Sequence, residues 1–147
     1  MIEDLRQKLL RHLRFLESEL ADSGRFAGLT RDEYLKDSDR RRNVERWAEN
    51  ILNSLIDTAK IALTIERIPL GDSYRELVES LSAVEEFKTL DMPRFASWTR
   101  FRNVLAHEYL DVRWRTLEHF VLDAPGQCQA FLESAKRYLI RISESQR

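Results

Sequence analysis

The segment from about Asp39 to Glu66 constrains the fold more than any other, because it contains no Gly or Pro and repeats apolar residues at helical spacing. One mainly apolar row consists of Val44, Trp47, Ile51, Leu55, Thr58, Ala62 and Ile65. A second row beside it consists of Leu52, Ile56, Ala59 and Leu63. A helix packed on a single neighbour needs only one such row. The segment is therefore predicted to be the longest helix, buried on two sides by other helices or by a second subunit.

Further helices are expected before and after this segment. Helical spacing and capping residues predict them at about 2–23, 31–35, 74–88, 93–109, 112–121 and 124–142. Thr30 with Glu33, and Ser73 with Glu76, have the spacing of a capping box, in which the hydroxyl and the carboxylate each accept a hydrogen bond from a free backbone amide. No strand-turn-strand pattern occurs. The predicted fold class is all-α: an antiparallel helical bundle with four to five main helices plus short ones.

The chain of 147 residues is long enough to bury a core without disulfides or metals, so one domain over residues 1–147 is expected. The one cysteine, Cys128, lacks the paired spacing of a zinc site and is expected to be a small residue on a helix near the core. The net charge of −1 argues against a general nucleic-acid coat protein. No apolar run could cross a bilayer and no leader pattern occurs, so no membrane partner and, by default, a cytoplasmic location are expected.

Residues 101–110, FRNVLAHEYL, gather an unusual set of reactive side chains. If the helix from Pro93 continues through Tyr109, one face of it is core and consists of Trp98, Phe101, Leu105 and Val112. Arg102, Asn103 and His107 lie on the adjoining arc, where their polar ends can converge. Tyr109 falls almost directly below Arg102, at the border of the core face.

Arg102 is expected to be partly buried, because Phe95 and Trp98 flank it on the same helix. A partly buried arginine must be paired or hydrogen-bonded. Asn103 or Glu108 of this chain, or a partner subunit, could supply that contact.

This set of side chains suits cleavage of RNA by its own 2′-hydroxyl. Histidine gains or loses a proton near neutral pH, so His107 could take the hydroxyl proton or deliver one to the leaving oxygen. Arg102 could stabilise the charge that builds on phosphorus, and Asn103 could orient the substrate or the arginine. No metal is required, and no histidines or carboxylates cluster at ligand spacing.

The mechanism needs both an acid and a base, yet this stretch has a single histidine. A symmetric dimer would bring two copies of the stretch across one cleft. His119 is the other candidate, but it is expected to be a surface residue.

The spacing Arg-x4-His occurs by chance in many helical proteins, so from chemistry alone a structural role is favoured. In that interpretation Arg102 is a buried structural cation and His107 is a satisfied histidine at a helix end. Tyr109 then belongs to the core with its hydroxyl at the edge.

The wider stretch FRNVLAHEYLDV closely resembles the signature of the HEPN-domain toxins of the HepT-like family. That signature is Arg, four residues, His, any residue and Tyr, usually with Asn directly after the Arg. The matching positions are Arg102, Asn103, His107 and Tyr109.

The resemblance continues outside the motif. The block NVERWAENILNSLIDTAKIAL and the residues Gly71-Asp-Ser-Tyr74 also look like the family, so it spans about Arg41 to Val112. Lys60 departs from the pattern, because many relatives carry a histidine or another polar residue there. No supporting role of that position carries over.

The resemblance implies a HEPN-type bundle that dimerises with two Arg-His motifs facing a shared cleft. It implies a metal-independent endoribonuclease without a cofactor, acting as the toxin of a type VII-like toxin-antitoxin pair. The residues it assigns are Arg102 and His107 as catalytic and Asn103 as supporting, and Glu108 is a further supporting candidate because it could pair with Arg102. The antitoxin of such pairs is a minimal nucleotidyltransferase that can add AMP to the motif tyrosine, here Tyr109.

Two alternatives stay open. The first is a non-catalytic HEPN module in which Arg102 and His107 recognise phosphate, so that its dimer binds nucleotide, RNA or a nucleotidyltransferase. The second is a helical assembly protein in which the motif is structural.

Overall fold

The computed structural model describes residues 1–145, and in that range it contains only helices, turns and connecting segments. The α-helices are α1 (Ile2–Ala21), α2 (Arg31–Lys36), α3 (Ser38–Ile65), α4 (Tyr74–Ser80), α5 (Met92–Ser97), α6 (Phe101–His107) and α7 (Leu110–Glu144). Four 3₁₀ turns join them: η1 (Ser23–Arg25), η2 (Leu81–Ala83), η3 (Glu85–Phe87) and η4 (Trp98–Arg100). The predicted all-α fold is confirmed. Within this range no helix is both long enough and apolar enough to cross a membrane.

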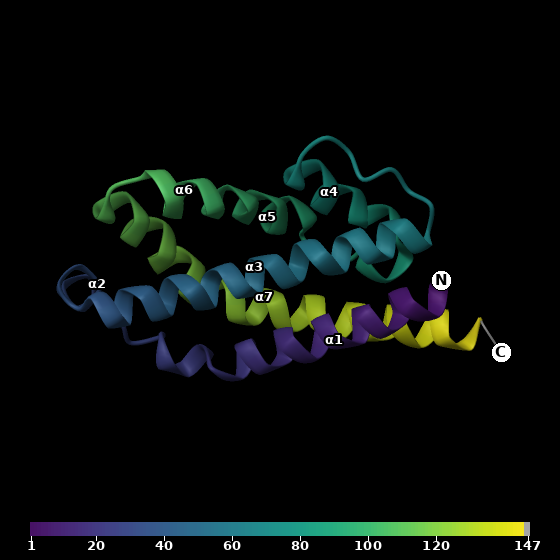
Figure 1. Ribbon diagram of the computed structural model, residues 1–147, viewed down its shortest axis with the longest axis horizontal. Helices are drawn as coiled ribbons and strands as arrows, with labels where there is room; N and C mark the ends of the chain where they lie inside the picture. The colour runs from purple at the N-terminus through teal and green to yellow at the C-terminus, as the bar shows by residue number, and fades with distance from the viewer. Residues whose placement is uncertain (146–147) are drawn as a thin grey trace.

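The three long helices α1, α3 and α7 lie side by side, and the short helices α4, α5 and α6 form a broken fourth row along α3 (Figure 1). The chain reverses direction from α1 to α3, again along the row α4 to α6, and again into α7. This is the expected antiparallel bundle. The N-terminus and the end of α7 lie at one end of the bundle, whereas α2, α6 and the start of α7 lie at the other.

Helix α3 is the centre of the core, as its two apolar rows predict. Both rows are buried except for Ile65, which is half-buried. The helices that contact α3 include α1, α2, α4, α6 and α7 of the same chain, so its burial needs no second subunit. Asp37 begins the helix by accepting hydrogen bonds from the amides of Asp39 and Arg40, at 3.1 Å and 3.2 Å. Trp47 ties α3 to α1 by donating from Nε1 to the Glu19 carbonyl oxygen at 2.8 Å.

Helix α7 corrects one prediction, because the two helices expected at 112–121 and 124–142 are one helix of 35 residues. Pro125 lies inside it, where proline removes a hydrogen bond and bends a helix. Figure 1 shows that α7 changes direction along its length. The helix continues because its buried face is unbroken across the proline, through Phe120, Val121, Ala124, Cys128 and Phe131. Cys128 is therefore in the core as expected, and burial raises the pKa of its thiol.

The expected helix to about Lys88 ends at Ser80 and is followed by η2 and η3. Leu81, Val84 and Phe87 are spaced three apart and are all buried. Val84 lies between the two 3₁₀ turns and is extended, with a ψ of 128°. The α-helix therefore gives way to two short 3₁₀ turns with an extended residue between them, and all three side chains lie in the core.

The expected helix 93–109 is interrupted by η4, between α5 and α6. Phe95, Trp98 and Phe101 are also spaced three apart and buried. The rings of Trp98 and Phe101 meet the Phe120 ring of α7 edge-on, with centroids 5.1 Å and 4.8 Å away. This aromatic contact fixes α6 against α7.

Candidate active site

Helix α6 presents the motif on its outer face because Phe101 anchors its inner face. Phe101 is 5% exposed, whereas Arg102, Asn103 and His107 are all exposed. The predicted core face is correct for Trp98, Phe101 and the half-buried Leu105, but Val112 lies on α7 and is exposed.

Tyr109 lies outside α6, which corrects its predicted place below Arg102. The helix ends at His107, and Glu108 and Tyr109 are extended, with ψ angles of 157° and 162°. The Tyr109 side chain is 88% exposed rather than at the edge of the core. Glu108 is exposed and forms no ion pair with any residue in the described range. The motif therefore ends in a short extended turn that presents the phenol to solvent.

Arg102 is exposed rather than partly buried, because Phe95 and Trp98 pack inward and leave its side chain outside. Its Cζ lies over the Tyr74 ring, 5.4 Å from the ring centroid. No carboxylate within residues 1–145 forms an ion pair with it, so the expected contact with Glu108 is absent there. In the same range, neither Arg102 nor Asn103 is hydrogen-bonded to His107. The partner of the arginine is an aromatic ring.

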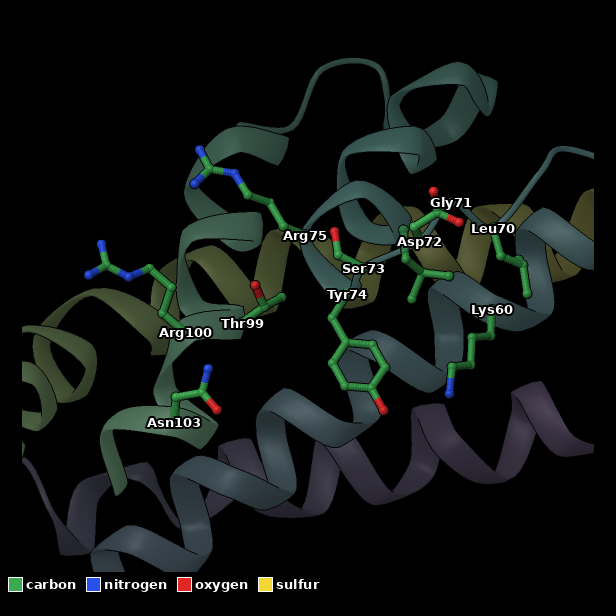
Figure 2. Close-up of a pocket in the computed structure, with 11 residues that line it drawn as sticks. Lys60, Leu70, Gly71, Asp72, Ser73, Tyr74, Arg75, Thr99, Arg100 and Asn103 are labelled. Carbon is green, nitrogen blue, oxygen red and sulfur yellow. The ribbon is translucent and has the colours of Figure 1, made fainter. Parts of the chain in front are cut away.

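A pocket of about 570 Å³ lies where α3, the loop before α4, η4 and α6 meet (Figure 2). Its lining includes Lys60, Tyr74, Thr99, Arg100 and Asn103. His107 follows Asn103 on the same helix, about 6 Å farther along the axis. The pocket therefore borders the motif.

The loop before α4 is held in one conformation by its own residues. Gly71 has a φ of 77°, where side chains are strained, and a Cβ there would lie 2.8 Å from the Cβ of Glu76. The Glu76 carboxylate accepts from the Asp72 amide at 2.8 Å, and the Ser73 hydroxyl accepts from the Glu76 amide at 3.1 Å. The serine half of the predicted capping box is correct, whereas the Glu76 carboxylate accepts from the amide of Asp72 rather than from that of Ser73. The result is a fixed position for Tyr74, the first residue of α4.

A partly buried polar network holds the other side of the motif. Arg113 of α7 donates to both carboxylate oxygens of Glu45 on α3, and the Tyr34 hydroxyl of α2 donates to the same carboxylate. Burial and the hydrogen bond to Glu45 raise the pKa of Tyr34. Sequence reasoning missed this network, because its members are far apart in the chain and none belongs to the motif. It fixes the start of α7 and thereby the turn that carries Tyr109.

His119 does not complete the motif in this chain. It is exposed, as expected, and lines a different pocket of about 390 Å³ together with Phe101 and Arg115. Arg100 lines both pockets. Residues 1–145 contain no group of three or more His, Cys, Asp or Glu side chains placed to hold one metal ion.

The helical bundle and the exposed Arg-x4-His-x-Tyr motif define a HEPN-type protein. A family model described as Ribonuclease HepT-like matches residues 15–135. The chain therefore belongs to the HepT-like ribonuclease family, which confirms the resemblance and extends it into α1. A search of curated proteins and a search of solved structures each found no match.

Proposed function

We propose that the protein is a metal-independent endoribonuclease toxin that cleaves RNA through Arg102 and His107. The observation that carries this proposal is the exposure of both side chains on a helix anchored to the core, in a chain of a ribonuclease family. His107 accepts the proton of the RNA 2′-hydroxyl, whose oxygen attacks the adjacent phosphorus. A 2′,3′-cyclic phosphate forms, and the 5′-oxygen of the next nucleotide leaves and takes up a proton. Arg102 stabilises the negative charge that develops on the phosphate.

The reacting centre is proposed to contain two copies of the chain. The leaving oxygen needs an acid while the hydroxyl needs a base, and each motif supplies one imidazole. A homodimer with two-fold symmetry would supply both from two copies of His107. The exposed Tyr109 and Val112, 88% and 36% exposed, support an interface near the motif, because they place apolar surface there.

Growth after expression of the chain alone tests this proposal. Expression is expected to arrest growth, and His107→Ala is expected to abolish the effect at equal protein level. His119→Ala is the matched control, because it removes another exposed imidazole from a different pocket. Equal toxicity of His107→Ala and the parent chain would contradict the proposal.

A minimal nucleotidyltransferase is proposed as the antitoxin, and Tyr109 as its target. The Tyr109 hydroxyl would attack the α-phosphorus of ATP, release pyrophosphate and lose its proton to solvent. The exposure of the side chain supports this reaction. The product places a negative charge two residues from His107, where it would repel an RNA phosphate.

Intact-mass measurement after co-expression with a nucleotidyltransferase encoded next to the chain tests the modification. The chain is expected to gain AMP units, and Tyr109→Phe is expected to gain none. Tyr74→Phe is the control, because Tyr74 is also exposed, at 42%. A gain that survives Tyr109→Phe would overturn the assignment.

A further inference from the structure

Two cationic side chains share the ring of Tyr74. The Nζ of Lys60 lies 5.3 Å from the ring centroid, and the Cζ of Arg102 lies 5.4 Å from it. Both distances are within the range of a cation–π contact. Among the residues that the structure describes, neither cation forms an ion pair with a carboxylate. Within that part of the chain, two positive charges are thus held beside one ring without an ion pair to a carboxylate, which favours binding of an anion there.

The surroundings of the ring form a concave and mainly basic site. Lys60, Tyr74 and Asn103 line the pocket of about 570 Å³. Figure 2 shows the Tyr74 ring directed toward α3, the helix that carries Lys60, whereas Arg75 and Arg100 extend away from the ring. Asp72 is the acidic side chain of the lining. The anion site therefore consists of Lys60, Arg102 and the Asn103 amide rather than of the whole rim.

The site is continuous with the motif. Arg102 belongs to both, since it contacts Tyr74 and precedes His107 by little more than one helical turn. An RNA strand repeats its phosphate with every nucleotide. A strand that places one phosphate at Arg102 and His107 can therefore offer a neighbouring phosphate to Lys60.

We propose that Lys60 and Asn103 form a second phosphate subsite for the RNA substrate, with Tyr74 as the positioning residue that orients Lys60 and Arg102. This inference rests on the proposed ribonuclease function. A lysine ammonium is a compact charge that suits phosphate.

Binding of a fluorescein-labelled single-stranded RNA oligonucleotide to the full-length His107→Ala protein tests the subsite. Adding Lys60→Gln is expected to weaken binding roughly three- to tenfold and to reduce the slope of log affinity against log salt by about 0.7. Lys136→Gln is the charge-matched control, because Lys136 pairs with Glu17 and does not line the pocket. Equal affinities and slopes for the two lysine variants would overturn the proposal.

Two variants test Tyr74. Tyr74→Phe keeps the ring and is expected to bind the RNA as the parent does, whereas Tyr74→Leu is expected to weaken binding as Lys60→Gln does. In the protein with intact His107, Lys60→Gln is expected to raise KM more than it lowers kcat. Equal RNA affinity of Tyr74→Leu and Tyr74→Phe, with both folded by circular dichroism, would contradict the positioning role.

The outcomes separate this subsite from the proposed activity. If RNA binding depends on Lys60 but the protein cleaves no RNA, the subsite is supported and the ribonuclease activity is contradicted. If the protein cleaves RNA but Lys60→Gln changes neither KM nor the slope of log affinity against log salt, the subsite is contradicted and the ribonuclease activity is supported. If AMP binding depends on Lys60 but RNA binding does not, the occupant is a free nucleotide and the RNA subsite is overturned.

Discussion

The guanidinium of Arg102 lies over the ring of Tyr74, with its Cζ 5.4 Å from the ring centroid. The motif arginine on α6 is thus oriented by the first residue of α4, whose position depends on the loop before that helix. The conformation of that loop consequently matters for the motif.

Gly71→Ala is expected to destabilise the protein by about 1–2 kcal/mol, since alanine is strained at positive φ. The new Cβ would also lie 2.8 Å from the Cβ of Glu76, which displaces the start of α4 and Tyr74. Urea unfolding measures the loss, and RNA cleavage is expected to fall with it. Gly24→Ala is the control, because a Cβ there meets nothing within 4 Å. Equal stability of the two variants would contradict the strain at Gly71.

Arg102→Ala is expected to leave the protein folded. Its side chain is exposed and its main contact is the cation–π contact with Tyr74, so the loss of unfolding free energy is expected to be below about 1 kcal/mol. RNA cleavage is expected to be lost. Urea unfolding and circular dichroism check this, and an unfolded variant would favour the helical assembly protein with a structural motif.

Glu45→Gln is expected to cost about 2–4 kcal/mol, because it leaves Arg113 and Tyr34 largely buried without their carboxylate. Arg31→Ala is the matched control: its ion pair with Asp111 also joins α2 to α7, but the side chains are 60% and 64% exposed. Exposed pairs contribute about 0–1 kcal/mol. Chemical denaturation of both variants measures the difference, and equal costs would show that the Glu45 network stabilises no more than a surface pair.

The lowered pKa of the Glu86 carboxyl predicts that the stability of the protein depends on pH. The hydrogen bonds of Glu86 with Arg141 hold the pKa of the carboxyl below the ordinary 4.5. A lowered folded-state pKa stabilises the protein above about pH 4.5, and the stabilisation is lost as the pH falls through the folded value. Melting temperatures from pH 7 to pH 3 are therefore expected to fall more steeply for the parent than for Glu86→Gln. Parallel curves would contradict this contribution.

Much of the bundle could be predicted because it depends on local periodicity. The apolar rows of α3 and the caps at Thr30 and Ser73 depend on nearby residues. The continuity of α7 through Pro125 could not be predicted, because its tertiary packing outweighs the local signal to stop. The turns η2, η3 and η4 could not be predicted either, because tertiary packing also decides them.

The motif was located from sequence, but its contacts were not. Helical phasing placed Arg102, Asn103 and His107 on one outer arc, and all three are exposed. The predicted position of Tyr109 below Arg102 was wrong because α6 ends at His107. The contact between Arg102 and Tyr74 joins two separate elements, which no periodicity within one helix reveals.

The most direct test of the account is cleavage of labelled single-stranded RNA by the purified chain in EDTA, with the product ends identified. The parent is expected to produce 2′,3′-cyclic phosphate ends, and His107→Ala is expected to reduce the rate at least about 100-fold. His119→Ala is expected to stay within a few-fold of the parent. A parent chain that binds RNA but leaves it intact from pH 5 to pH 8, or an undiminished rate for His107→Ala, would contradict the central claim.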